Sequence, residues 1–376
     1  MIKHLFIFLF LVVSYATLAQ NIPNKNILHF YVGTYTDSGS EGIYRFGLDT
    51  QSGKLHSNGL AVLSENPSYL AMSKDGRNLL AVRETKDESN HSQGYIELFK
   101  IDETGNLTSV NKVSSGGAHP CYVSVNEDGL VLASNYTGGN VALMRIEPTG
   151  ELSEVLSADQ HTGHGPVADR QEKPHVHSAI FEPKGKRIFV ADLGIDQVKV
   201  YTIDKTTTTL KPNKYPEIKL PPGSGPRHMA IHPNGKLLFI ANEIGCNVSV
   251  VQLLDNGAFK IVETVSTLPA NFAKPNTCAD IHLSPEGNFL YVSNRGMNSI
   301  AIFSVNEKEQ KLKLLGHEDT KGEMPRNFTL TPQGDFLLVA NQNTDNIVAF
   351  RRNAETGLLT YTDQINAFKP VCLLFK

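Results

Sequence analysis

Short runs of alternating hydrophobic and polar residues follow one another along the chain, and most of them end at turns rich in glycine, proline or asparagine. Alternation with a period of two is typical of β-strands that are buried on one face. No long segment places hydrophobic residues at every third or fourth position, so we expect very little helix. The pattern therefore predicts an all-β protein.

One strand–turn–strand pattern recurs through the chain. The segments EPKGKRIFVADLG, HPNGKLLFIANEIG, SPEGNFLYVSNRG and TPQGDFLLVANQN are close copies, and SKDGRNLLAVRET and NEDGLVLASNYTG are weaker ones. Their turn glycines lie about 50 residues apart, at Gly76, Gly129, Gly185, Gly235, Gly287 and Gly334. An internal repeat of this length is typical of propellers and solenoids.

Each repeat contains four predicted antiparallel strands, which is the content of one propeller blade. The first strands are expected to begin near seven positions, Pro67, Pro120, Pro174, Pro226, Cys278, Pro325 and Pro370. The fourth strands are expected to begin near Leu107, Leu152, Leu210, Phe259, Leu312 and Leu358. The chain starts with a second-type strand and ends with a first-type strand, so the termini should complete one blade together and close the ring without an unpaired edge. The sequence thus predicts a seven-bladed β-propeller with four antiparallel strands per blade, in which the N- and C-termini share one blade.

The first residues form a separate segment. A basic Lys3 precedes a short apolar run, and Ala16 and Ala19 supply small residues before Gln20. This order is typical of a secretory signal peptide over residues 1–19, and the apolar run is too short for a comfortable membrane span. Residues 20–376 are expected to form one propeller domain, which would be periplasmic or secreted after cleavage.

Charge and cysteine content narrow the class of partner. The formal net charge is −3 and the pI is about 6.5. A protein that binds nucleic acids or anionic membranes needs a concentrated basic surface, so neither is an expected partner, and we expect a monomer or a weak oligomer.

Four cysteines do not make a disulfide scaffold, and we expect that no bridge is required for folding. Cys246 and Cys278 are the one plausible pair, because adjacent blades would carry them at the same face.

Two columns of the repeat carry candidate chemistry, because the starts of first strands and the ends of second strands meet around one mouth of a propeller channel. The first column reads Ser68, Cys121, His177, Arg227, Ala279, Arg326 and Val371. The second reads Tyr35, Glu84, Tyr136, Leu193, Glu243, Arg295 and Gln342. Unpaired buried charge is costly, so these arginines and glutamates should either pair with one another or be kept for a ligand.

Histidines gather before one of the first strands. The segment KPHVHS places His175 and His177 on the same side of an extended chain, and His161, His164 and Asp169 lie in the preceding loop. Imidazoles and a carboxylate suit zinc, but their spacing matches no defined metal motif, so we expect no metal and no other cofactor. No Gly-x-Ser-x-Gly motif supports a serine-hydrolase triad. Acid–base chemistry with cationic stabilisation fits the two columns better.

The segments GSGPRHMAIHPNGKLLFIANE, RQEKPHVHS, ADIHLSPEGNFLYVSNRG and MPRNFTLTPQG resemble the seven-bladed propeller lactonases of the 6-phosphogluconolactonase type. That family also includes the fungal carboxymuconate-lactonizing enzyme, and the likeness runs from about Tyr31 to Phe375. It implies a metal-free fold acting on lactone esters, with the catalytic residues His177, Arg227, Glu243 and Arg295. Arg170, Gln171 and Arg326 match further family motifs, and with His175 and His228 they make up the candidate substrate-binding set.

The resulting prediction is a hydrolase that opens a small anionic lactone with water. Either Glu243 or His177 would be the general base, and the arginines would hold the anionic group. Since the 6-phosphogluconolactonase reaction belongs to a cytosolic pathway, the export signal makes an unphosphorylated sugar lactone or another acid lactone plausible. Two alternatives stay open: a cycloisomerase that closes or opens a lactone without water, and a propeller that only binds a ligand at this face.

Overall fold

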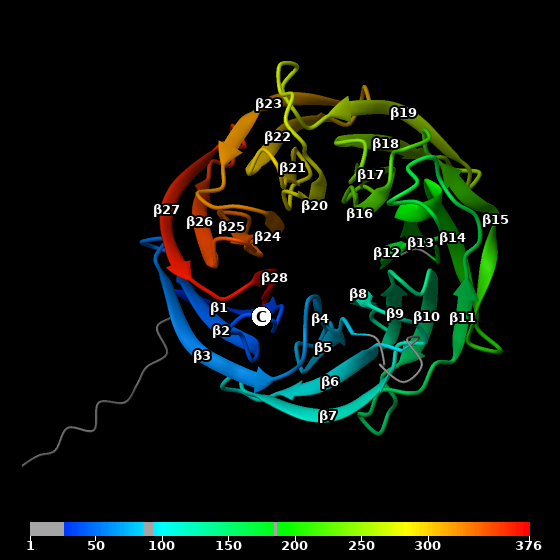
Figure 1. Cartoon of the computed structure of the whole chain (residues 1–376), viewed down its shortest axis with the longest axis horizontal. Coiled ribbons are helices and arrows are strands. Elements are labelled where there is room, and N and C mark those ends of the chain that lie inside the picture. The colour runs from blue at the N-terminus through cyan, green and yellow to red at the C-terminus, as the bar shows by residue number, and fades with distance from the viewer. Residues whose placement is uncertain (1–25, 86–92, 184–185) are drawn as a thin grey trace, which may run out of the picture.

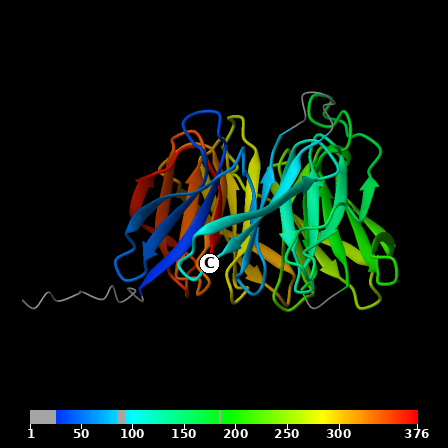
Figure 2. The ribbon, with the colours of Figure 1, turned by 90° about the horizontal axis from the view of Figure 1, so that it is seen from below.

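The computed structural model describes residues 26–85, 93–183 and 186–376, so the predicted signal peptide lies outside the described residues. The described residues form seven four-stranded antiparallel sheets arranged as blades around a central channel (Figure 1). Seen from the side, the blades form a thick disc whose strands run between its two faces (Figure 2). The predicted seven-bladed β-propeller is confirmed.

Helix is as scarce as the sequence predicts. Across the described ranges the helical content is one turn of 3-10 helix, η1 (Leu193–Ile195). No helix among the described residues is long and apolar enough to cross a membrane.

We number the blades 1 to 7 around the ring and give each blade's strands from the channel outward. Blade 1 consists of β28 (Pro370–Phe375), β1 (Ile27–Thr34), β2 (Gly42–Asp49) and β3 (Leu55–Leu63). Blade 2 consists of β4 (Leu70–Met72), β5 (Asn78–Arg83), β6 (Tyr95–Ile101) and β7 (Leu107–Ser114). Blade 3 consists of β8 (Pro120–Val125), β9 (Leu130–Asn135), β10 (Asn140–Arg145) and β11 (Ser157–Gln160). Blade 4 consists of β12 (Val176–Phe181), β13 (Ile188–Asp192), β14 (Gln197–Asp204) and β15 (Thr209–Lys219).

The remaining three blades repeat the same order. Blade 5 consists of β16 (Pro226–Ile231), β17 (Leu237–Asn242), β18 (Asn247–Leu253) and β19 (Phe259–Ser266). Blade 6 consists of β20 (Cys278–Leu283), β21 (Phe289–Asn294), β22 (Ser299–Asn306) and β23 (Lys311–Asp319). Blade 7 consists of β24 (Pro325–Leu330), β25 (Phe336–Asn341), β26 (Asn346–Arg352) and β27 (Leu359–Asn366).

The last strand of the chain closes the ring. Strand β28 pairs antiparallel with β1, so that Phe375 lies opposite Phe30 and Leu373 lies opposite Val32. The C-terminus therefore supplies the inner strand of blade 1 and the N-terminal part supplies its outer three, as the strand types predict. Pairing the two ends removes the free strand edges that an open ring would expose.

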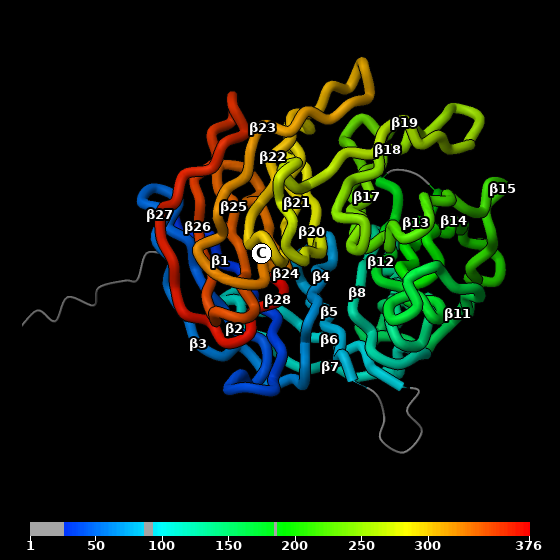
Figure 3. The backbone as a smooth tube through the Cα atoms, turned by 45° about the horizontal axis from the view of Figure 1, so that its top comes forward, coloured from blue at the N-terminus to red at the C-terminus, as the bar shows by residue number. Residues whose placement is uncertain are grey.

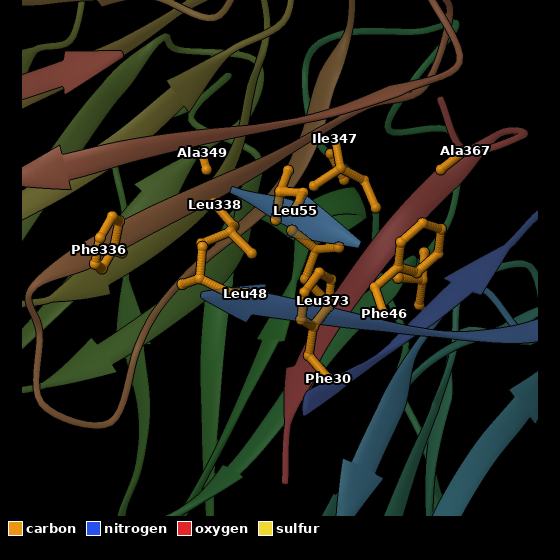
Figure 4. Packing of buried hydrophobic residues seen from close by; sticks show 12 residues of the cluster. Phe30, Phe46, Leu48, Leu55, Phe336, Leu338, Ile347, Ala349, Ala367 and Leu373 are labelled. Atoms are coloured by element: carbon orange, nitrogen blue, oxygen red, sulfur yellow. The ribbon is translucent and has the colours of Figure 1, made fainter. Parts of the chain in front are cut away.

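A hydrophobic cluster fills each joint between neighbouring blades. Figure 4 shows the joint between blades 7 and 1, where Phe30, Phe46, Phe336, Leu338 and Leu373 interdigitate. The described residues contain one such cluster for every joint of the ring. Burying a large aliphatic or aromatic side chain stabilises a fold by about 1.5–3 kcal/mol, so these joints give the inner strands a rigid frame.

Six of the seven inner strands, all except β4, carry a β-bulge near their first residue, and this irregularity positions the site. Pro325 pairs with Asn341 and Asn327 pairs with Ala340, which leaves Arg326 outside the ladder. The same skip occurs at three further column residues, Cys121, His177 and Val371. A bulge inserts an extra residue, bends the strand and re-aims a side chain, and bulges are common next to active sites.

Blades 5 and 6 have wider bulges. In β16 both Arg227 and His228 lie opposite the single residue Ala241, because the ladder jumps from Pro226 to Met229. In β20 both Ala279 and Asp280 occupy the corresponding gap. These two strands therefore place two residues outside the regular pairing, whereas β8, β12, β24 and β28 place one.

One predicted strand start is wrong. The fourth strand of blade 3 begins at Ser157 and not near Leu152, which forms only an isolated bridge with Ile146. The Ser153 hydroxyl accepts a hydrogen bond from the backbone N–H of Arg145 and takes the place of a ladder partner. Regular pairing consequently resumes only four residues later.

Candidate active site

The candidate site lies where the inner strands begin and the second strands end, around the channel axis on which the inner strands converge (Figure 3). A cavity of about 200 Å³ opens there. Its lining residues are Glu84, Cys121, Tyr136, Arg170, His177, Glu243, Arg295 and Arg326. Apart from Arg170, all of them come from the two columns that the sequence singles out. Rigid strands and their bulges thus supply most of the cavity wall.

Glu243 is the centre of a buried charge cluster. Its Oε2 atom lies 2.8 Å from Arg295 Nη2 and 3.0 Å from Arg227 Nε, and its Oε1 atom lies 2.5 Å from Arg170 Nη2. Burial alone would raise the pKa of this carboxyl, but Arg295, Arg227 and Arg170 together lower it to about 2. The carboxylate is therefore ionised at any physiological pH and is a weak proton acceptor.

Two of these arginines are fixed by carbonyl groups of the blade 6 inner strand. Arg227 Nη1 donates to the carbonyl oxygen of Ala279 at 2.6 Å, and Arg295 Nη2 donates to that of Cys278 at 2.8 Å. Both guanidinium groups keep a buried Nε–H that makes no hydrogen bond among the described residues, since Arg227 Nε approaches Glu243 outside hydrogen-bond geometry. Buried donors are normally satisfied, so these two Nε–H groups are unsatisfied donors within the wall of the cavity.

His177 lies beside the cluster with its ring almost fully buried. Its Nε2 atom is 4.0 Å from Glu243 Oε2, and its Nδ1 atom is 3.7 Å from Cys121 Sγ. Tyr136 and His228 meet the ring edge to face, at centroid distances of 5.5 and 5.3 Å. Burial, assisted by the nearby Arg227, lowers the pKa of His177 well below its usual value. The imidazole is therefore neutral at neutral pH and can accept a proton.

The opposite wall of the cavity is built differently. Glu84 accepts a hydrogen bond from the hydroxyl of Tyr35 at 2.8 Å and a second one from the hydroxyl of Ser68. The Arg326 guanidinium lies over the Tyr35 ring, 5.4 Å from its centroid. Among the described residues no carboxylate lies within 4.0 Å of Arg326, so this cation has an aromatic neighbour but no ion-pair partner.

The charges around the cavity do not balance. Four guanidinium groups, those of Arg170, Arg227, Arg295 and Arg326, face the two carboxylates of Glu84 and Glu243, while His177 is neutral. A surplus of two positive charges in a small, partly buried space is unfavourable unless an anion enters. The arrangement therefore attracts a negatively charged group.

A second polar cluster lies further along the same inner strands. His228 Nδ1 is 2.7 Å from Asp280 Oδ1, and His282 Nε2 and Asn327 Nδ2 contact the other oxygen. Burial, with help from Arg227, lowers the pKa of His228 to about 4, so this ring is neutral and donates its Nδ1 proton to Asp280. Its free Nε2 atom faces Arg227 Nη1 at 3.4 Å. Asp280 thereby fixes the tautomer of a histidine that contacts Arg227.

This cluster borders a separate cavity of about 350 Å³ in the channel, which is also lined by Tyr69 and Tyr122. The two tyrosine rings stack at a centroid distance of 4.1 Å, and His228 meets both of them edge on. Each Asp280 oxygen already accepts at least two hydrogen bonds. The carboxylate is therefore a fixed part of the structure that needs no ligand.

Hydrogen bonds to blade 4 hold the loop that carries Arg170. His161 Nδ1 is 2.7 Å from Asp192 Oδ2, and the other oxygen of Asp192 accepts the backbone N–H of His175. Gln171 is fully buried and donates to the carbonyl oxygen of Leu193 and to Asp196 Oδ1. These bonds hold the loop over blade 4 and bring Arg170 to Glu243.

The structure brings His177, Arg227, Glu243 and Arg295 into one cluster, with Arg170 joined to it. Arg326 lines the same cavity from the other side. The other three candidates lie outside the cavity lining: His175 stacks on Tyr136 at 4.5 Å, Gln171 holds the loop, and His228 lies beneath Arg227.

Four residues that the geometry connects to the site are not among the predicted catalytic and substrate-binding residues. Cys121 stands in the first column, and Glu84 and Tyr136 stand in the second. Asp280 follows the column residue Ala279, and its signal in the sequence is an acidic residue at a position of the inner strand where the other repeats have none.

Comparison with known proteins gives a consistent result over nearly the whole chain. The family described as lactonase, 7-bladed beta-propeller, matches residues 29–375. A 6-phosphogluconolactonase of Bacillus subtilis (strain 168) is 37% identical over 349 residues, which cover 92% of this chain and 97% of the relative. A 6-phosphogluconolactonase of Formosa agariphila is 39% identical over 340 residues, covering 88% of this chain and 94% of the relative.

A solved structure extends the similarity to three dimensions. The periplasmic gluconolactonase PpgL of Pseudomonas aeruginosa superposes with a TM-score of 0.88 at 31% sequence identity. The match covers 93% of this chain and 99% of that one.

Proposed function

The chain belongs to the seven-bladed β-propeller lactonases, and from this premise we propose that it is a carboxylic ester hydrolase that opens a small anionic lactone with water. The substrate would be a sugar lactone or another acid lactone, in keeping with the 6-phosphogluconolactonases and the gluconolactonase that it resembles. The periplasmic neighbour and the sequence of residues 1–19 favour an exported enzyme.

The unpaired cationic surplus of the cavity is the observation that carries this proposal. Arg326 has no carboxylate partner among the described residues, and the Nε–H groups of Arg227 and Arg295 make no hydrogen bond there. Guanidinium groups bind carboxylates and phosphates through paired N–H donors. A lactone that carries an acidic group would supply the missing negative charge.

Cavity size supports a small substrate. Sites for drug-sized ligands usually measure about 300–1,000 Å³, whereas this cavity has a volume of about 200 Å³. One sugar-sized ring fits this description better than an oligosaccharide or a long acyl chain.

In the proposed reaction His177 is the general base. Its neutral imidazole takes a proton from water while the water oxygen adds to the lactone carbonyl carbon. Glu243 is a poor base because its pKa is about 2, so its role is to hold the arginines and to stabilise the imidazolium that forms 4.0 Å away. Of the two candidate bases, the electrostatics favour His177.

The arginines stabilise the charge that develops on the carbonyl oxygen. Preorganised donors in a site with little water typically contribute a factor of about 10²–10³ each to turnover. The ring C–O bond then breaks and the ring oxygen takes the proton back from His177. The carboxylic acid so formed releases the second proton of the water to solvent, and the product carboxylate remains against the guanidinium groups. Product and transition state are both more anionic than the substrate, which the surplus positive charge favours.

A panel of lactones tests the proposal. Purified protein lacking residues 1–19 is assayed for acid release with neutral, carboxylated and phosphorylated lactones of similar ring size, in ordinary and in ¹⁸O-labelled water. We expect the highest kcat/KM with an acidic lactone and one labelled oxygen in the product carboxylate. Turnover without label would indicate a cycloisomerase, and saturable binding without turnover of any lactone would indicate a ligand-binding propeller; either result overturns the proposal.

A further inference from the structure

Four of the turns between second and third strands end in a residue of left-handed backbone conformation. Asp196, Cys246, Asn298 and Asp345 have φ values of 56°, 50°, 53° and 52°. Asparagine and aspartate are the non-glycine residues that tolerate this conformation best, whereas cysteine has no such preference. Cys246 therefore departs from its equivalents in blades 4, 6 and 7.

The residue at this turn position clamps the next blade. Asp196, Asn298 and Asp345 each accept a backbone N–H from the residue that immediately precedes the next inner strand, namely Gly225, Met324 and Lys369. At the joint between blades 5 and 6 the carboxylate or amide is missing. There the Cys246 sulfur contacts the side-chain nitrogen and the carbonyl oxygen of Asn276, at 3.4 and 3.1 Å.

The same joint breaks the repeat a second time. The residue that pairs with the end of the second strand is proline in four inner strands, Pro120, Pro226, Pro325 and Pro370. In blade 6 this residue is Cys278, which pairs with Asn294. Two repeat positions are thus altered at one joint, and both have been altered to cysteine.

The two cysteines lie together. Cys246 packs against the buried cluster that contains Cys278. Asn276 Nδ2 lies 3.4 Å from Cys246 Sγ and 3.1 Å from Asn294 Oδ1, and Cys278 Sγ lies 3.6 Å from the same Asn294 oxygen. The neighbouring thiol lowers the pKa of Cys246 and raises that of Cys278. Thr267 ties them further, because its hydroxyl lies 3.2 Å from Cys278 Sγ and donates to the carbonyl oxygen of Cys246 at 3.0 Å. Cys246 is partly exposed and Cys278 is fully buried. An accessible thiolate beside a buried partner thiol is the arrangement of an oxidisable pair.

We propose that Cys246 and Cys278 form a reversible disulfide that fastens blade 5 to blade 6, a modification site in which a covalent bond replaces the side-chain clamp of the other joints. The oxidant is a small-molecule disulfide. The Cys246 thiolate attacks one of its sulfurs and releases one thiolate, giving a mixed disulfide. Cys278 then loses its proton and attacks Cys246 Sγ, which forms the protein disulfide and releases the second thiolate. Two cysteines are oxidised and one external disulfide is reduced to two thiols.

The bond would form directly behind the candidate site. The backbone N–H of Cys278 donates to the carbonyl oxygen of Glu243 at 3.1 Å, and the Cys278 carbonyl accepts Arg295 Nη2. A bridge at this joint therefore restrains the backbone that carries both partners of an ion pair of the cavity.

Mass spectrometry after oxidation provides the test. The protein lacking residues 1–19 is equilibrated with oxidised or reduced glutathione, denatured in excess alkylating agent and digested. We expect the oxidised sample to lose two of its four alkylatable thiols and to yield one crosslinked peptide pair containing Cys246 and Cys278. The melting temperature should rise by about 3 °C or more on oxidation and return on reduction.

Cys246→Asn restores the residue type of the equivalent turn in blade 6, so it provides the matched control. This variant should keep its three thiols under oxidation and show no change in melting temperature between the two buffers, and Cys278→Ser should behave alike. A stable glutathione adduct on Cys246, a bridge between two chains, or four free thiols at the most oxidising ratio would each overturn the proposal. None of these readouts depends on lactone turnover, so the outcome is independent of the proposed function.

Discussion

Glu84 and Glu243 occupy the same position of the repeat on opposite sides of one cavity. Each follows the last residue of a second strand, β5 or β17. Glu243 is surrounded by three guanidinium groups, whereas Glu84 is bound by the hydroxyls of Tyr35 and Ser68. The backbone presents both carboxylates alike, and the neighbouring blades decide what each one touches.

The same repeat position therefore has a different role in blade 2, where it holds Glu84, and in blade 5, where it holds Glu243. On the Glu243 side the carboxylate neutralises arginines, so its removal would expose buried positive charge. On the Glu84 side the arginine that shares the wall, Arg326, rests on an aromatic ring and is left for a ligand. One half of the cavity is therefore internally paired and the other half is open to an anion.

Glu243→Gln should have the largest effect. Buried Arg227 and the partly buried Arg295 and Arg170 lose their counter-charge, so we expect kcat to fall about 100-fold or more and the free energy of unfolding to fall by roughly 3 kcal/mol. Affinity for an anionic lactone should not weaken, because the positive surplus rises from two to three. Steady-state kinetics and denaturant unfolding measure the two effects. Glu286→Gln, which removes the carboxylate paired with Arg352 outside the cavity, is the control and should leave kcat unchanged. Normal kcat in Glu243→Gln would make the cluster structural only.

Arg227→Lys keeps the positive charge next to Glu243 but removes the planar guanidinium group with its paired N–H donors. The lysine cannot hold Glu243 and the Ala279 carbonyl together, so kcat/KM should fall about tenfold or more, which corresponds to about 1.4 kcal/mol of transition-state stabilisation. Arg187→Lys, at the Glu182 ion pair outside the cavity, is the matched substitution and should not alter kcat/KM. Equal rates for the two variants would contradict the role of the paired donors.

The dependence of kcat/KM on pH tests whether His177 is the general base. Because the pKa of His177 lies well below 6.5, kcat/KM should stay flat from about pH 8 to 6.5 and fall only at lower pH, as the imidazole gains a proton. Stability should also fall with pH, since a carboxyl whose pKa is lowered from 4.5 to about 2 stabilises the fold fully above pH 4.5 and loses this contribution, about 3 kcal/mol, on the way down to pH 2. The stability loss below pH 4.5 should be smaller in Glu243→Gln. An acid limb of kcat/KM that starts above pH 6.5 would exclude His177 in this role.

Asp280→Asn should affect Arg227 indirectly, through His228. The amide no longer fixes His228 against Arg227, so we expect KM for an acidic lactone to rise roughly threefold to tenfold while a neutral lactone is little affected. His282→Gln touches the same carboxylate from its exposed side without reaching Arg227 and should have a smaller effect. A general loss of stability with equal effects on charged and neutral lactones would show that Asp280 serves only the fold.

Glu84→Gln should change least. Its side-chain carbonyl can still accept hydrogen bonds from Tyr35 and Ser68, and no ion pair within 4.0 Å is broken among the described residues. We expect kcat/KM to change by about threefold or less and stability by less than about 1 kcal/mol. A loss as large as that of Glu243→Gln would remove the distinction between the two sides.

The repeat explains why so much was predictable from sequence. The glycine turns set the period, the strand types at the two ends predicted the shared blade, and the columns named seven of the eight cavity-lining residues. The columns could not say which arginines would reach Glu243 and which would stay unpaired, because that depends on distances across blades. Asp280 was missed since simple alternation assigns one residue per strand to the channel, whereas the wide bulge of β20 brings two. The reach of Arg170 depends on a loop held by buried His161 and Gln171, and no period describes it.

The shared blade also fixes an order of events in the life of the chain. Strand β28 is synthesised after the other strands of the propeller, whereas its partner β1 is the first of the described strands, so Phe30 and Phe375 are separated by almost the full length of the domain. Contacts of such long sequence separation form slowly because a very large loop has to close first. Until β28 has emerged, blade 1 lacks its inner strand and the joint between blades 7 and 1 lacks Leu373. Closure of the ring, and with it the fixed geometry of the cavity, therefore waits for the synthesis of β28.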